Sequence, residues 1–231
     1  MNKIALITGA NKGIGLEIGK ELLRREWIVI FTARNMALGR PLVDDLREEY
    51  KSAWFVQLNV TEEESIEYMA DYVMKEHGRV DVLINNAGIF LDEGKTTSSV
   101  EIEVLRKTME TNVYGPLQVT RALLPALNKS DDPRVLNLSS ELGQLSTMGS
   151  GSPAYRISKT ALNALTVIQA NELASEGIKV NAIHPGWVRT DMGGPNARKS
   201  IEEGADTAVW LATEPEIPTG KYFSERKEMD W

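Results

Sequence analysis

A tyrosine and a lysine stand four positions apart in the stretch SPAYRISKTALNALT, which covers residues 152–166. Side chains four residues apart are neighbours on a helix, so Tyr155 and Lys159 would share one face of it. A free phenol has a pKa of about 10 and exchanges its proton slowly at neutral pH, but a cation about 4 Å away favours the phenolate. We predict that Lys159 lowers the pKa of Tyr155 towards the range of a general acid or base.

A second face of this helix carries only apolar side chains. They are contributed by Ile157, Ala161, Ala164 and Ile168. An apolar stripe of this kind predicts contact with the protein core. The tyrosine and the lysine would then lie beside the core stripe, and a surface aromatic next to a solvated lysine is the alternative interpretation of the pair.

Three glycines follow the first apolar run, in the segment TGANKGIG. Glycine permits a tight turn and lets a pyrophosphate approach the backbone, where the free N–H groups of a helix start can bind it. We therefore predict a dinucleotide phosphate site, with a plain glycine-rich turn as the alternative. The expected cofactor contacts in this loop are Gly9, Asn11, Lys12, Gly13, Ile14 and Gly15.

Two cations accompany the glycine loop. The second apolar run ends in FTARN, and Arg34 stands where NAD-specific sites often place a carboxylate against the ribose 2′-hydroxyl. Lys12 lies within the glycine loop itself. Two cations without a carboxylate suit a 2′-phosphate, so we predict NADP(H) rather than NAD(H). Two ordinary solvated charges are the alternative.

Short apolar runs alternate with longer helical stretches along the 231 residues. Strands are expected at 4–8, 28–32, 54–58, 82–85, 135–138 and 180–183, with a weaker one at 221–223. Helices are expected at 14–26, 41–51, 62–76, 100–127 with a break at Gly115 and Pro116, 153–175 and 200–212. Because the strands are apolar nearly throughout rather than alternating, they should be buried on both faces. The alternation predicts a single, Rossmann-like, doubly wound α/β domain with a mostly parallel sheet of seven strands.

The composition excludes several classes of function. A net charge of −7 argues against a nucleic-acid binder. The chain has no cysteine, and its two histidines, His77 and His184, stand in no metal-ligand cluster, so no metal is expected. No apolar run reaches the length of a membrane span, and a strand begins almost at the first residue, which leaves no room for a signal peptide. We expect a cytoplasmic protein.

The motifs TGANKGIG, FTAR, NNAG, TNVYG and HPGWVRTDMGG together resemble the short-chain dehydrogenase/reductase family, and within it the carbonyl reductase branch. The similarity extends over nearly the whole chain. It implies an oxidoreductase that reduces a ketone, an aldehyde or a quinone with NADPH. A 3-oxoacyl-thioester reductase or an alcohol dehydrogenase of the same family is one alternative, and an NADP(H)-binding sensor without turnover is another.

The resemblance assigns further residues to the expected site. It implies catalytic roles for Asn112, Ser140, Tyr155 and Lys159, with Ser140 preferred over Ser139 as the hydroxyl that orients the carbonyl oxygen. The further implied cofactor contacts are Asn59 and Val60 near the adenine, Asn86, Ala87 and Gly88 after the fourth strand, and Tyr155, Lys159, Pro185, Gly186, Val188 and Thr190 around the nicotinamide and its ribose. Trp187 and Met192 are expected to wall the substrate space.

The resemblance also bears on assembly. Well-known monomeric carbonyl reductases carry a long helical insertion ahead of the active-site tyrosine, and this chain has only a short loop there. Lack of the insertion implies that helix faces are free to pair. We therefore expect a homodimer or a homotetramer.

Overall fold

The apolar runs of the sequence form the strands of one central sheet in the computed structural model, which describes residues 2–231. The strands are β1 (Ile4–Ile7), β2 (Ile28–Ala33), β3 (Ala53–Gln57), β4 (Val82–Asn85), β5 (Arg134–Leu138), β6 (Lys179–Ile183), β7 (Tyr222–Ser224) and β8 (Lys227–Met229). Their order across the sheet is β3-β2-β1-β4-β5-β6-β7-β8, and only the pair of β7 and β8 is antiparallel. This confirms the expected doubly wound fold, in which the strand order reverses between β1 and β4.

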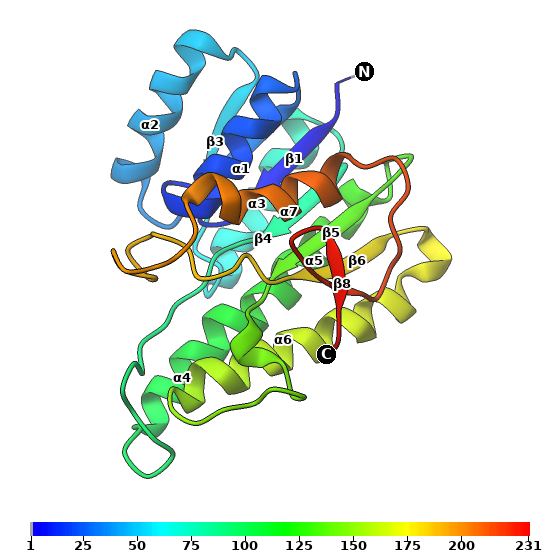
Figure 1. Cartoon of the computed structure of the whole chain (residues 1–231). Helices are drawn as coiled ribbons and strands as arrows, with labels where there is room; N and C mark the ends of the chain where they lie inside the picture. The colour runs from blue at the N-terminus through cyan, green and yellow to red at the C-terminus, as the bar shows by residue number, and fades with distance from the viewer. Residues whose placement is uncertain (1) are drawn as a thin grey trace.

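Helices cover both faces of the sheet (Figure 1). They are α1 (Gly13–Arg24), α2 (Met36–Glu49), α3 (Glu63–Glu76), α4 (Ile102–Met109), α5 (Gly115–Leu127), α6 (Pro153–Glu172) and α7 (Ile201–Thr213). Because successive strand residues point to opposite faces, Ala5 and Ile7 pack in one apolar cluster with α1, α2 and α7. Ile4 and Leu6 pack in a second cluster with α3, α5 and α6.

Most helices lie within three residues of their expected bounds, and two expected helices differ more. α2 begins at Met36 rather than at 41, because Asn35 Oδ1 accepts a hydrogen bond from Ala37 N at 2.9 Å and caps the helix. The expected helix 100–127 is interrupted by a π-helical turn, Glu110–Tyr114, which joins α4 to α5. The interruption comes just before the expected break.

The sheet has eight strands, not seven. The additional strand, β8, is three residues long and forms a hairpin with β7. Glu225 and Arg226 connect the two strands with φ angles of 50° and 60°, which are left-handed at both central positions, as in a type I′ turn. Asn-Gly or Asp-Gly normally signals such a turn, and this turn contains neither, so the sequence carried no sign of the hairpin.

Loops from distant parts of the chain leave the sheet on the same side. In Figure 1 the segment that follows β6 and the segment that leads from β4 to α4 both run to the left of the strands. These are carboxyl ends of parallel strands, where open α/β folds bind their ligands. Among residues 2–231, no helix combines the length and the hydropathy needed to cross a bilayer.

Candidate active site

The glycine loop is tied to the turn after β4. Thr8 Oγ1 accepts hydrogen bonds from Asn86 N at 3.0 Å and from Ala87 N at 2.9 Å. Asn86 Nδ2 donates to Thr8 O at 2.8 Å and to Gly9 O at 3.0 Å. Gly9 has a φ of 62°, and a Cβ at this position would meet Ala87 Cα at 3.0 Å. Glycine is therefore needed here, and Thr8, which the sequence analysis did not single out, holds the two turns together.

The segment between β6 and α7 lies against the same loop. A Cβ on Gly13 would come within 3.3 Å of Thr190 Cγ2. Lys12 Nζ forms an ion pair with Asp191 Oδ2 at 2.5 Å, although both side chains are exposed. The expected free cation of the glycine loop therefore has a carboxylate partner in the structure, contributed by a residue 179 positions later.

The remaining residues of that segment divide into buried and exposed ones. Val188 is buried, whereas Trp187 and Met192 are about half exposed. Trp187 Nε1 donates to Gly193 O at 2.7 Å, which fixes the indole to its own loop. The Trp187 and Met192 side chains are thus partly exposed on the segment between β6 and α7, which lies against the glycine loop.

Arg34 and Asn59 stand at the ends of β2 and β3. Arg34 is exposed, and within residues 2–231 its guanidinium forms no ion pair. The side chain of Asn59 closes the turn before α3: Nδ2 donates to Glu62 Oε1 at 2.7 Å, and Oδ1 accepts from Thr61 N at 3.3 Å. The amide that the resemblance places against an adenine is therefore hydrogen-bonded within its own loop.

Tyr155 and Lys159 lie together on the buried face of α6. They are 8% and 5% exposed. Lys159 Nζ lies 5.6 Å from the centroid of the Tyr155 ring and donates a hydrogen bond to Leu138 O at 2.8 Å. The two side chains are neighbours on one helix face, as expected, and the alternative of a solvated surface pair is wrong.

The expected core stripe of α6 is the exposed face. Ile157 and Ile168 are 46% and 52% exposed. The face that packs inward combines buried apolar residues, such as Leu162 and Ala170, with polar contacts, such as the 2.9 Å hydrogen bond from Asn137 Nδ2 on β5 to Thr166 Oγ1. The exposed apolar stripe forms part of a groove of about 600 Å³, whose walls include Leu145, Met148, Ile157, Ala161 and Ala164.

Burial controls the protonation of the tyrosine and the lysine. Burial raises the pKa of Tyr155 to about 12, and its hydrogen bond with the Ser140 side chain opposes this only in part. In the protein without a cofactor, burial of the phenol therefore sets the direction of the shift, and the expected lowering of this pKa by Lys159 is not seen there. Burial lowers the pKa of Lys159 to about 8, so the ammonium stays mostly protonated at pH 7. A phenol that keeps its proton at neutral pH is in the form that a general acid needs.

The two serines after β5 have separate roles. Ser139 is buried, and its Oγ donates to Asn163 Oδ1 at 2.5 Å. Against the effect of burial, the Ser140 side chain lowers the pKa of Tyr155, which places it near the phenol, and its Oγ accepts from Leu142 N at 3.2 Å. Ser140 is therefore the serine near the phenol, and its role in orienting a carbonyl oxygen stays a prediction from the resemblance.

A π-helical turn buries Asn112 completely. Its Oδ1 accepts from Ile89 N at 2.8 Å, and its Nδ2 donates to Ile89 O at 2.9 Å and to Ser158 Oγ at 3.0 Å. A Cβ on Gly88 would lie 3.4 Å from Asn112 Oδ1 and 3.6 Å from Lys159 Nζ. The asparagine, the lysine and the turn after β4 therefore meet at one place.

The helix that carries the tyrosine is anchored by Asp92, which the sequence analysis missed. The carboxylate is fully buried; Oδ2 accepts from Ala154 N at 2.6 Å and Oδ1 from Tyr155 N at 3.3 Å. A carboxylate at a helix N-terminus satisfies free N–H groups and interacts favourably with the helix dipole. Ser152, at the usual cap position, makes no side-chain cap. No local signal could reveal the cap, because it comes from another loop.

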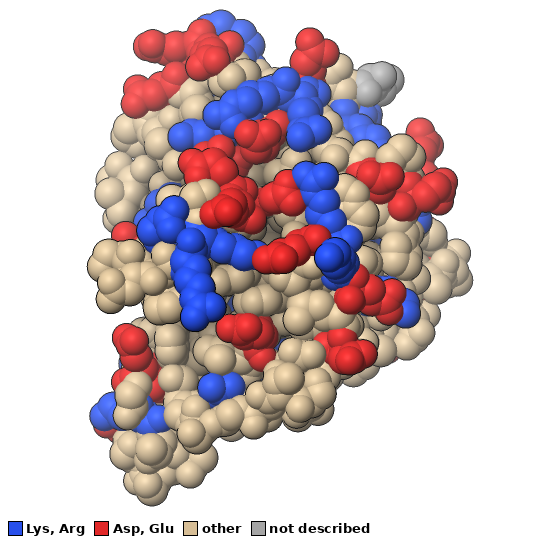
Figure 2. Space-filling model, viewed as in Figure 1, with Lys and Arg blue, Asp and Glu red and all other residues tan. Residues whose placement is uncertain are grey.

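The loop after β1 and the turn after β4 fit a dinucleotide at the place where the strand order reverses. The loop after β1 and the turn after β4 present backbone without room for Cβ atoms, and a Cβ on Gly15 would lie only 2.4 Å from Asn86 Nδ2. Figure 2 shows acidic and basic side chains interspersed over the face that it draws, in keeping with the net charge of −7.

Comparisons with known proteins agree with this geometry. Residues 3–201 match the family model described as short chain dehydrogenase. Carbonyl reductase (NADPH) 1 of Bos taurus is 37% identical over 278 aligned positions, which cover 100% of this chain and 99% of the relative. Because the chain has 231 residues, the bovine protein has segments that this chain lacks.

Two solved structures are similar over their full lengths. The NADPH-bound carbonyl reductase from chicken fatty liver has a TM-score of 0.91 and 29% identity, covering 100% of this chain and 99% of that one. The carbonyl reductase Sniffer of D. melanogaster has a TM-score of 0.90 and 27% identity, with 100% of both chains covered. The chain therefore belongs to the short-chain dehydrogenase/reductase family.

Proposed function

We propose that this protein reduces a carbonyl compound, namely a ketone, an aldehyde or a quinone, to the alcohol with NADPH. The observation that carries the proposal is the meeting of Ser140, Tyr155, Lys159 and Asn112 beside the turn after β4. The names of the relatives support the same cofactor and reaction, since they are carbonyl reductases and one of them was solved with NADPH bound.

The residues divide the work on a carbonyl group. NADPH, when bound, supplies the hydride. Ser140 orients the carbonyl oxygen, and Tyr155, protonated at neutral pH, gives its proton to that oxygen. Lys159 then stabilises the phenolate that remains, because its charge is held close to the ring in a site from which water is largely excluded. Asn112 fixes the backbone of Ile89 and so holds the π-helical turn next to the lysine.

The proton donor is tested by Tyr155→Phe. The phenylalanine keeps the ring packed against Phe90, whose centroid lies 4.6 Å away, but has no proton to give. We expect turnover to be lost while the Kd for NADPH stays near the wild-type value. Turnover is followed by the absorbance of reduced nicotinamide with a panel of quinones, aldehydes and ketones, and Tyr68→Phe on an exposed tyrosine is the matched control. Tight NADPH binding by the wild type without turnover of any panel member would favour the sensor alternative.

The cofactor preference depends on Arg34. An arginine can bind a 2′-phosphate with two parallel hydrogen bonds, and Lys12 can add a second charge once it leaves Asp191. Arg34→Asp should raise the KM for NADPH and lower the KM for NADH, whereas Arg106→Asp on exposed α4 should change neither. A wild type that prefers NADH would refute this part of the proposal.

The exposed face of α6 supports an oligomeric assembly. We expect two copies to pair through the stripe that contains Ile157 and Ile168, because about half of each side chain is otherwise left in water. The expected assembly is a homodimer, or a homotetramer built from it.

A further inference from the structure

The imidazole of His184 bridges the two turns that line the proposed site. It follows β6 directly and is 9% exposed. Its Nδ1 accepts a hydrogen bond from Glu141 N at 3.1 Å and a longer one from Gly186 N at 3.4 Å. Glu141 is the residue after Ser140, and Gly186 belongs to the turn that the resemblance places against the nicotinamide. A single ring nitrogen thus holds the serine turn and the nicotinamide turn at a common point.

These contacts require one protonation state of the ring. A nitrogen that accepts from two backbone N–H groups cannot carry a proton, so the neutral ring has its proton on Nε2. Nε2 faces Glu141 Oε2 at 3.5 Å. A second proton could enter only at Nδ1, where it would point at the two donors and break both contacts.

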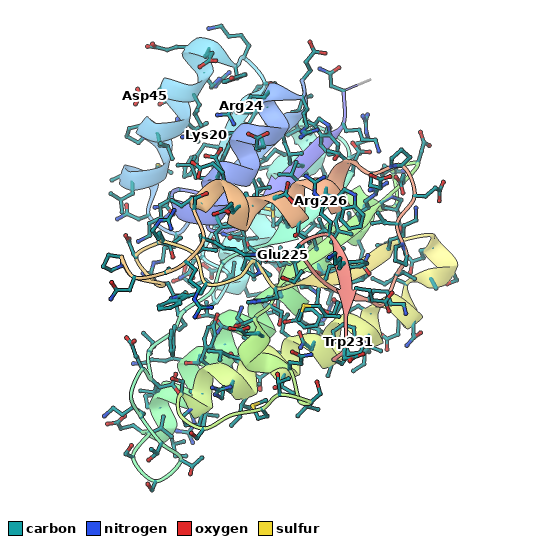
Figure 3. All side chains as sticks on the ribbon, in the orientation of Figure 1. Lys20, Arg24, Asp45, Glu225, Arg226 and Trp231 are labelled. Carbon is teal, nitrogen blue, oxygen red and sulfur yellow. The ribbon has the colours of Figure 1, made fainter. Side chains whose placement is uncertain are left out.

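The charged groups around the ring come from three elements. Glu141 belongs to the 3₁₀ turn after β5, Lys199 to the segment before α7, and Glu225 to the turn between β7 and β8, where Figure 3 labels it. Lys199 Nζ pairs with Glu225 Oε1 at 2.9 Å. Burial lowers the pKa of His184 below its ordinary value of 6.5, assisted by Lys199 and opposed by the two carboxylates.

Lys199 also supports the nicotinamide turn from its other side. A Cβ on Gly186, whose φ is 92°, would lie 2.5 Å from Lys199 Cδ. The backbone of Lys199 pairs with that of Trp187 at 3.0 Å and with that of Arg189 at 3.0 Å. The Gly186 turn is therefore held by Lys199 on one side and by His184 on the other. Of these two contacts, only the one with His184 also reaches the Ser140 turn.

The geometry points to neutral His184 as a positioning residue for the proposed reaction: it fastens the Ser140 turn to the Gly186 turn and releases both when it is protonated. The expected effect on reaction rate rests on the proposed function. The tautomer and the protonation state of the His184 ring do not depend on that function. The position of Ser140 relative to a cofactor depends on this link, and small displacements of reacting groups reduce rates strongly.

The ring is tested first in the cofactor-free protein. His77 is the only other histidine, and it packs against Trp54 and Tyr72 away from the site. His77→Asn therefore leaves a single imidazole signal, and ¹⁵N NMR across the acid range reads its tautomer and its titration. We expect the proton on Nε2 and a midpoint below 6.5. A proton on Nδ1, or a midpoint above 6.5, would overturn the inference whether or not the protein reduces carbonyl compounds.

Kinetics then test the positioning role. In the wild type kcat/KM should fall by about tenfold per pH unit below the His184 midpoint. His184→Leu removes the acceptor and should lower kcat/KM at pH 8 by up to ~100-fold. His184→Asn offers an amide oxygen in its place, so it should recover most of that loss and should not show the acid fall. His77→Asn should follow the wild-type profile.

Two kinetic results would contradict the inference. One is an acid fall in His184→Asn equal to that of the wild type. The other is a kcat/KM of His184→Leu equal to the wild-type value at pH 8. Thermal melting shows whether His184→Leu folds. If it does not fold, the tautomer of His184 from NMR and the pH profile of kcat/KM in His184→Asn still test the inference.

Discussion

Replacing Lys159 with methionine removes a buried charge and keeps an unbranched side chain of similar length. Burial lowers the pKa of Lys159 from 10.5 to about 8. A difference of about 2.5 pKa units corresponds to about 3 kcal/mol of unfavourable free energy for holding the ammonium in the folded protein below pH 8. The hydrogen bond to Leu138 O offsets about 1 kcal/mol of this. Lys159→Met should therefore be about 2 kcal/mol more stable than the wild type at pH 7, although it should lose turnover.

The pH dependence separates the charge from the packing. Because the folded pKa lies below the unfolded one, the unfolded chain binds more protons between pH 8 and 10.5, and the wild type gains stability as the pH rises through this window. The methionine variant lacks that gain. Its advantage in the free energy of unfolding, measured by urea denaturation, should therefore shrink by about 2 kcal/mol between pH 7 and about pH 9.5.

A surface lysine provides the control for this experiment. Lys129 is exposed, and Lys129→Met should change the free energy of unfolding by a similar small amount at both pH values. If the difference between Lys159→Met and the wild type were the same at both pH values, the ammonium would not be held at a cost in the folded protein, and the burial argument would fail.

Two further substitutions test contacts that join distant segments, and a third tests the proposed pairing of α6. Asp92→Ala removes both hydrogen bonds to the start of α6 and should cost about 2–3 kcal/mol, or about 5–10 °C in Tm, while Asp45→Ala on the exposed side of α2 (Figure 3) should stay within ~0.5 kcal/mol. Equal melting of the two variants would show that the buried carboxylate does not cap the helix. Asp191→Asn frees Lys12 and should tighten NADPH binding about threefold at low salt, an effect that high salt should abolish; an unchanged Kd at low salt would mean that the ion pair does not compete with the phosphate. Ile157→Glu should shift the protein from dimer to monomer in light scattering, and a wild type that is already monomeric would refute the pairing of α6.

Local patterns predicted the elements and much of the site. Strands that are apolar nearly throughout are typical of sheets buried on both faces, so the parallel sheet followed from the runs themselves. The positive φ of Gly9 is a local reason for a glycine at that position, as expected for the tight turn of the loop. The four-residue spacing of Tyr155 and Lys159 is likewise a property of the helix alone. β8 escaped prediction because its turn residues carry no hairpin signal.

The sequence alone thus determined which side chains could do the chemistry and on which elements they stand, because helix and strand periodicities are local. Only the tertiary structure decided the environment of those side chains. Burial raises the pKa of Tyr155 to about 12 and lowers that of Lys159 to about 8. The sequence analysis expected the opposite direction for the phenol, because it considered only the nearby cation. Asp92, His184 and Asp191 act on residues from other loops. Desolvation and contacts between distant segments depend on the packed chain as a whole, and no short stretch of residues contains them.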